Sequence, residues 1–184
     1  MNRDIVIGLL NDYREQYPIE AATIEQYQRF VAANPDCFER TLLSGHTTGS
    51  AWLVNPAMTH VLLTHHRKLN IWVQLGGHAD GNGDLLDVAL REAREESGIA
   101  TIDVFSPKLF DIDIHAIPER GNEPAHYHYD ARFALVASHS EFTVSEESHD
   151  LAWVEIASSE EKTQEPSMLR MAGKWAALQA HQNL

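Results

Sequence analysis

The sequence holds a single cysteine, Cys37, among its 184 residues. A disulfide within the chain needs two cysteines, so an internal disulfide framework is excluded and a reducing compartment is expected. Basic residues are also few, because 14 Lys and Arg stand against 27 Asp and Glu and leave a formal net charge of −13. A chain without a basic stripe is a poor match for phosphate backbones, so we expect neither nucleic acid nor an anionic membrane as a partner.

Long hydrophobic runs are missing as well. The apolar stretch 5–10 is short, is followed by Asn11 and Asp12, and lacks a small-residue cleavage site, so it is not typical of a signal peptide. No apolar run is long enough to span a bilayer. Hydrophobic residues still make up 43% of the chain, which is enough for a real core. These features predict a globular cytoplasmic protein.

The N-terminal residues 1–40 are predicted to form a helical appendage. Apolar residues fall near helical spacing from residue 5 until Pro18, and a second helix is expected over 23–33. The remainder, 41–184, is predicted to be one compact domain.

Beyond residue 41, the pattern changes to short strands around one central helix. Apolar runs bounded by turn residues predict strands at 50–54, 60–65, 70–75, 102–105, 108–115, 128–137 and 152–156. A helix is expected over 85–97, between Asp84 as its N-cap and Gly98 as a left-handed stop. The tail 167–182 also reads as helical. Strands on both sides of a helix, with helices at either end, predict a mixed α/β layered domain.

The central helix carries an unusual set of charges. Glu92, Glu95 and Glu96 are three and four residues apart, so they project to one side of the helix. Carboxylates on one face repel each other, and a divalent cation such as Mg²⁺, which prefers oxygen ligands, relieves this repulsion. Arg91 lies beside them and can hold a carboxylate by forked hydrogen bonds. The alternative is a solvated charged face, which is the usual meaning of an Arg- and Glu-rich helix.

The surrounding segment, Gly77 to Ile99, resembles the Nudix box. Its pattern is Gly, five residues, Glu, seven residues, Arg-Glu, an apolar residue, any residue, Glu-Glu, any residue, Gly and an apolar residue. Gly77 matches the first position. The second half matches in correct spacing at Arg91, Glu92, Ala93, Glu95, Glu96, Gly98 and Ile99. One position departs, because the first Glu of the pattern falls on Gly83, where Asp80 or Asp84 could substitute in part.

The resemblance implies an α/β/α sandwich with a mixed sheet and a hydrolase of diphosphate bonds. The implied substrate is a nucleoside diphosphate derivative, and the implied cofactor is Mg²⁺, with Mn²⁺ as the alternative. By the same analogy the three glutamates of the helix bind the metal, and Arg91 joins them in the catalytic set. Members of the family often recruit a general base from a loop after the central sheet, where this chain has Glu146 and Glu147, although an exposed acidic loop would look the same. A homodimer is expected only by analogy.

Eleven histidines are many for this length, and several fall at suggestive places. Residues two apart in a strand face the same side, so His126, His128 and Asp130 can line one side as metal ligands or phosphate contacts. His46 follows a Ser-Gly pair, and His115 lies at a predicted strand end. For each histidine alone, a surface or hydrogen-bonded core position is the alternative. Together they predict a substrate-binding set of Gly76, Gly77, His78, His126 and His128.

Two other functions stay open. The position of His78 is similar to one in isopentenyl diphosphate isomerase, a relative of the same fold that binds metal through histidines and glutamates. That enzyme carries a catalytic cysteine just before its histidine, where this chain has Gly76 and Gly77, and Cys37 lies far upstream. The second alternative is a non-catalytic nucleotide-binding module, suggested by Gly83. Such a module would bind nucleotide without magnesium-dependent turnover.

Overall fold

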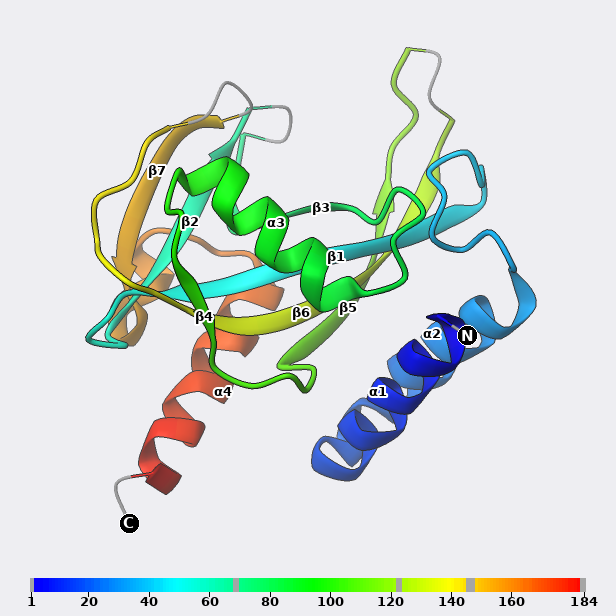
Figure 1. Cartoon of the computed structure of the whole chain (residues 1–184), viewed down its shortest axis with the longest axis horizontal. Coiled ribbons are helices and arrows are strands. Elements are labelled where there is room, and N and C mark those ends of the chain that lie inside the picture. Colours follow the sequence, from blue (N-terminus) through cyan, green and yellow to red (C-terminus); the bar gives the residue numbers. More distant parts are fainter. Residues whose placement is uncertain (1, 68–69, 122–123, 145–147, 183–184) are drawn as a thin grey trace. The chain divides into compact units, whose positions relative to one another are not determined.

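The computed structural model describes residues 2–67, 70–121, 124–144 and 148–182 (Figure 1). Its helices are α1 (Asn2–Gln16), η1 (Pro18–Glu20), α2 (Ala21–Ala33), α3 (Leu85–Ser97), η2 (Ile156–Glu161) and α4 (Pro166–Gln182). Its strands are β1 (Gly45–Val54), β2 (His60–His66), β3 (Trp72–His78), β4 (Ile102–Val104), β5 (Asp111–Ile117), β6 (His126–Ala137) and β7 (Ser148–Glu155). The predicted α/β class is confirmed, with a mixed sheet, flanking helices and helices at both ends of the chain.

The strands of the described chain are hydrogen-bonded in the order β4-β6-β1-β3-β2-β7, and β5 pairs with β6. β1 also pairs with β2 in antiparallel register at Val54 and Val61, so the two strands form a hairpin. The turn is closed by Asn55, whose Oδ1 accepts hydrogen bonds from the backbone N–H of Thr59 and His60 at 2.9 and 3.0 Å. An Asn side chain that accepts in this way replaces the backbone bonds that a turn leaves unmade.

The chain forms two compact units, each assembled from three segments. The first unit contains Met1–Ser50, Gly76–Ala89 and Pro107–Phe133. The second unit contains Ala51–Leu75, Leu90–Ser106 and Ala134–Leu184. The boundary expected near residue 40 stays a prediction.

In the first unit, α1 and α2 lie side by side (Figure 1), and α2 joins β6 through aromatic contacts. The phenol of Tyr27 donates to the backbone carbonyl of Tyr129 at 2.7 Å, and both side chains are buried. The ring of Phe30 stacks on the ring of Tyr129 with centroids 3.7 Å apart. Buried aromatic pairs of this kind add to the hydrophobic contribution of their area, so the two N-terminal helices are part of this unit's core.

In the second unit, α4 is held by Trp175. Its ring, which is fully buried, packs against Phe105 with centroids 4.9 Å apart, and its Nε1–H donates to the carbonyl of Met58 at 3.1 Å. A buried indole N–H normally finds such a partner.

Of the helices in the described chain, none is both long enough and apolar enough to cross a membrane.

The third strand differs from the expectation. It was expected over 70–75, with Gly76 and Gly77 ending it, but β3 continues through both glycines to His78. The reason is the close approach of Ser50 on β1, because a Cβ at position 76 would lie 2.7 Å from the Ser50 Cβ. A glycine inside a strand often marks such an approach of two backbones rather than a break. His78 is therefore fixed by a strand.

Candidate functional site

The helix α3 begins and ends where the sequence predicts. Asp84 acts as the N-cap, since its Oδ1 accepts the backbone N–H of Asp87 at 3.1 Å. Gly98 follows the last turn with φ +71°, the left-handed conformation that a glycine adopts without steric cost. Between these ends, Val88, Ala89 and Ala93 are fully buried and fix the rotation of the helix about its axis.

The glutamates of α3 differ in exposure. Glu92 and Glu96 are half-buried, whereas Glu95 is exposed. Glu92 has a side chain 16% exposed and accepts a hydrogen bond from Arg91 at 2.7 Å. Residues four apart on a helix lie one above the other, so Glu92 and Glu96 share one stripe. A stripe of carboxylate oxygens provides the hard ligands that Mg²⁺ prefers.

The two carboxylates near Gly83 have other contacts. Arg40 donates through Nε to Oδ1 of Asp80 at 2.6 Å and through a second nitrogen to Oδ2. Asp84 is engaged in capping the helix, and its own backbone N–H donates to Asn82 Oδ1 at 3.0 Å. Both aspartates therefore order the loop ahead of α3.

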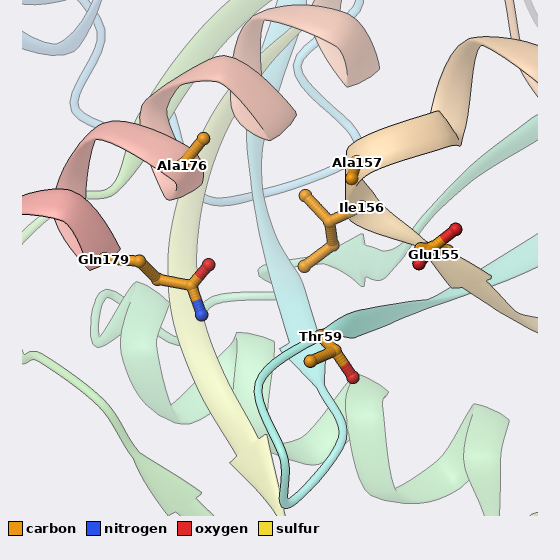
Figure 2. Close-up of a pocket in the computed structure, with 6 residues that line it drawn as sticks. All are labelled: Thr59, Glu155, Ile156, Ala157, Ala176 and Gln179. Carbon is orange, nitrogen blue, oxygen red and sulfur yellow. The ribbon is translucent and has the colours of Figure 1, made fainter.

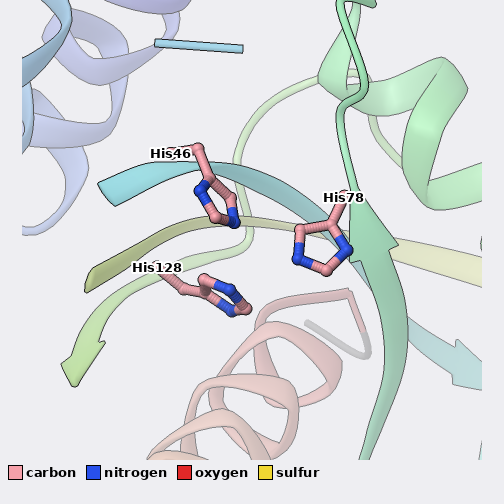
Figure 3. Close-up of side chains that lie close together, drawn as sticks. All are labelled: His46, His78 and His128. Atoms are coloured by element: carbon pink, nitrogen blue, oxygen red, sulfur yellow. The ribbon is translucent and has the colours of Figure 1, made fainter. Parts of the chain in front are cut away.

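Three histidines from three strands of the first unit converge, and we call His46, His78 and His128 the histidine cluster. One ring nitrogen of each lies within 4.8 Å of the others. His46 comes from β1, His78 from the end of β3 and His128 from β6, and Figure 3 shows the rings facing a common point. His46 is 2% exposed, and the other two are half-buried.

Two more histidines lie beside the cluster. His126 has Nδ1 2.8 Å from the carbonyl of Pro124, and a carbonyl only accepts, so this nitrogen carries the proton and Nε2 carries the lone pair. That Nε2 lies 3.2 Å from Nε2 of His128. His115 has Nδ1 3.3 Å from Oδ2 of Asp113, and its ring meets that of His128 edge-on at 5.3 Å.

The protonation of His128 follows from these surroundings. Burial, together with the positive charge that His115, His78, His46 and His126 can carry, lowers the pKa of His128 from 6.5 to about 2. Its imidazole is therefore neutral at physiological pH. The neutral ring is the form with a lone pair available to a metal ion.

Asp130 shares the sheet face of His126 and His128, as the alternation predicts, but it makes other contacts. Its Oδ1 accepts from the hydroxyls of Thr48 and Ser50 at 2.8 and 2.7 Å. Its Oδ2 accepts from Nε of Arg132 at 2.7 Å. The structure thus brings together the histidines of the predicted set and directs Asp130 into a buried polar network.

This network was missed by the sequence reasoning, and so was the place of His46 inside the cluster. Arg132 also contacts Asp111 at 3.2 Å and Asp113 at 3.4 Å. Burial alone would lower the pKa of Arg132, but the three carboxylates together raise it above its ordinary value. The sequence does hold a signal for the place of His46. His46, Thr48 and Ser50 are spaced two apart, so they share one face of a strand that starts at residue 45.

The predicted general base cannot be placed, because Glu146 and Glu147 lie outside the described residues. A pocket in the second unit does not replace it. The described residues that line it are Thr59, Glu155, Ile156, Ala157, Ala176 and Gln179 (Figure 2). None of these six is basic, so this pocket is a poor site for a phosphate.

Comparison with known proteins identifies the family. The model of the NUDIX domain matches residues 46–172, whereas no curated protein matches the chain by sequence. Among solved structures, a NUDIX-family hydrolase from Clostridium perfringens is 24% identical with a TM-score of 0.55, covering 72% of this chain and 97% of that one. A C. elegans Ap4A hydrolase is 17% identical with a TM-score of 0.53, covering 73% and 98%. The E. coli dihydroneopterin triphosphate pyrophosphohydrolase is 15% identical with a TM-score of 0.55, covering 68% and 91%.

These identities show the shared fold, and so confirm the predicted Nudix-like architecture. The family match goes further, since it spans more than half of the chain and includes the whole segment Gly77 to Ile99. The chain therefore belongs to the Nudix family of hydrolases.

Proposed function

We propose that this protein is a Mg²⁺-dependent hydrolase that cleaves the diphosphate bond of a nucleoside diphosphate derivative in the cytoplasm. The observation that carries the proposal is the stripe formed by Glu92 and Glu96 on the capped helix α3. It lies in a domain of the Nudix family, in which the matching glutamates are expected to bind the metal.

The donor set fits the proposed cofactor. Glu92, Glu95 and Glu96 offer carboxylate oxygens, which suit Mg²⁺, with Mn²⁺ as the alternative. A bound ion would polarise the phosphate oxygens and lower the pKa of a bound water. Arg91 holds Glu92 in place through the contact at 2.7 Å and so fixes the direction of its second oxygen.

The remaining roles are assigned by proposal. Glu147 serves as the general base that takes the proton of the attacking water. The substrate phosphates lie against Gly76, Gly77, His78, His126 and His128. A ring N–H of His78 or of the neutral His128 can donate to phosphate oxygens.

The chain's cysteine disfavours the isomerase alternative. Cys37 is fully buried, and burial raises the pKa of its thiol to about 11. A buried, protonated thiol is poorly suited to exchange protons with a substrate. Hydrolysis does not need a cysteine, so it agrees better with this chain.

The test is a turnover assay on a panel of nucleoside diphosphate derivatives, with and without Mg²⁺, with products separated by chromatography. The panel includes Ap4A and dihydroneopterin triphosphate, the compounds named for two similar structures. The parent is compared with Glu96→Gln and with Glu15→Gln, a matched change at an exposed position of α1.

We expect Mg²⁺-dependent turnover that Glu96→Gln lowers by about 10²–10³-fold, the usual effect of removing one group that stabilises transition-state charge. Glu15→Gln should keep the parent rate. If a panel member binds but is never hydrolysed, the binding-module alternative replaces the proposal. Turnover that Glu96→Gln leaves unchanged would remove α3 from the catalytic site.

A further inference from the structure

The histidine cluster has the composition of a metal site of another chemical class. Its ligand atoms lie within 4.8 Å of one another, and each is an imidazole nitrogen. Zinc and related transition metals accept such nitrogens readily, whereas Mg²⁺ prefers oxygen. The cluster and the carboxylates of α3 therefore call for different ions.

His126 stands at a ligand-like distance from one member of the cluster, His128. Two nitrogens on a tetrahedral zinc ion, each at roughly 2.0–2.1 Å from the metal, lie roughly 3.3 Å apart. The Nε2 atoms of His126 and His128 are 3.2 Å apart. The lone pair of His126 is on Nε2, because its Nδ1–H is engaged by the carbonyl of Pro124. This arrangement, in which the outer nitrogen donates to a backbone carbonyl, is usual for metal-binding histidines.

The strands hold these rings in place before any ion arrives. His46 and His128 lie within strands, and β5 pairs with β6 so that His115 lies opposite His128. His115 is itself next to Asp113, at 3.3 Å. The glycine of β3 that permits close approach to Ser50 lies two residues before His78. Sites built on rigid elements keep their ligands in the geometry that binding requires.

We propose that the histidine cluster binds Zn²⁺ through His46, His78 and His128, with His126 as a neighbouring donor beside His128. The site is distinct in chemistry from the carboxylates of α3, and the proposal does not depend on hydrolytic activity. In this proposal His78 and His128 are ligands of the ion, which replaces the direct phosphate contacts given to them above. The contrasting explanation is a stack of histidines that contact one another and bind no ion.

The experiment uses the full chain, freed of metal by a chelator and then titrated with Zn²⁺ in competition with a chromogenic chelator. Reconstitution with Co²⁺ supplies a second readout, because tetrahedral nitrogen ligation gives a strong visible absorption band. The variants are His78→Gln and His128→Gln, both at half-buried positions. His139→Gln removes an exposed histidine outside the cluster, and Glu96→Gln removes a carboxylate of α3.

We expect one Zn²⁺ per chain. Each cluster variant should lose more affinity than the roughly 10- to 100-fold caused by removing an outer-shell partner. His139→Gln and Glu96→Gln should bind Zn²⁺ like the parent. Far-ultraviolet circular dichroism of the metal-free variants verifies that they fold, and if His128→Gln does not, His78→Gln carries the test. A parent that binds no stoichiometric Zn²⁺, or folded cluster variants that bind it as tightly as the parent, would overturn the proposal.

Discussion

Arg132 donates from Nε to Oδ2 of Asp130 at 2.7 Å, and neither side chain is more than 2% exposed. The same guanidinium contacts Asp111, which is fully buried, at 3.2 Å. Buried charges are costly unless each one has a partner of opposite sign. The first unit of the chain therefore depends on this arginine more than on an ordinary surface charge.

Replacing Arg132 with Met keeps much of its volume and removes its charge. Asp130 and Asp111 would stay buried without the guanidinium, so the free energy of unfolding should fall by about 3–5 kcal/mol. Chemical denaturation followed by circular dichroism measures this loss. Arg29→Met, at an exposed position of α2, is the control and should change stability by less than about 0.5 kcal/mol. Equal losses in the two variants would contradict the importance given to the buried network.

Gly98 is predicted to be intolerant of a side chain. Its φ is +71°, and an added Cβ would lie 3.1 Å from the Cβ of Thr143. Gly98→Ala should therefore cost about 1–2 kcal/mol in thermal or chemical unfolding. In Gly173→Ala, within α4, the new Cβ meets no described atom within 4 Å, so this variant should gain roughly 0.5–1 kcal/mol. Two changes of the same sign would show that the backbone conformation at 98 is not the cause.

Cys37 should make stability depend on alkaline pH. Burial raises the pKa of the folded thiol from 9.0 to about 11, so the unfolded chain loses this proton first as pH rises. The contribution is constant below pH 9 and then falls, by up to about 1.4 kcal/mol per pH unit, until about pH 11. Urea denaturation of the parent and of Cys37→Ala, at pH 8 and pH 10 in a reductant, measures the difference. The stability of the parent should fall further than that of the variant, and parallel decreases would refute the assignment.

Arg91 should act on catalysis through Glu92. Without the contact at 2.7 Å, the half-buried Glu92 carboxylate loses its fixed direction. For Arg91→Met we expect kcat to fall by about 10- to 100-fold and the Mg²⁺ concentration needed for half-maximal rate to rise. Arg94→Met alters an exposed arginine of the same helix and is the control. If both variants keep parental kinetics, Arg91 has no role in positioning Glu92.

The sequence predicts the end of an element reliably where the residues that determine it lie close together in the chain. The ends of α3 were predicted to the residue, because a capping aspartate and a left-handed glycine act within one turn of the helix. The start of β1 was placed five residues too late, at residue 50 rather than Gly45. His46, Thr47 and Thr48 are polar and do not suggest a buried strand, yet they are buried through contacts with distant segments.

The candidate site shows the same division. Period-two alternation correctly assigned His126, His128 and Asp130 to one face of β6. It could not show that Asp130 accepts a hydrogen bond from Arg132, two residues further along that face, instead of contacting the histidines. The alternation also could not predict that His46 lies beside His128. The two residues are 82 positions apart in the sequence, and only the pairing of strands brings them together.

The interleaving of the two compact units has a consequence for synthesis of the chain. Each unit draws on three separated segments, and the first needs residues as far as Phe133. A growing chain on the ribosome therefore cannot finish one unit and then begin the other. The histidine cluster is likewise incomplete until residue 128 has left the exit tunnel, so loading of an ion there would have to follow translation of more than two thirds of the message.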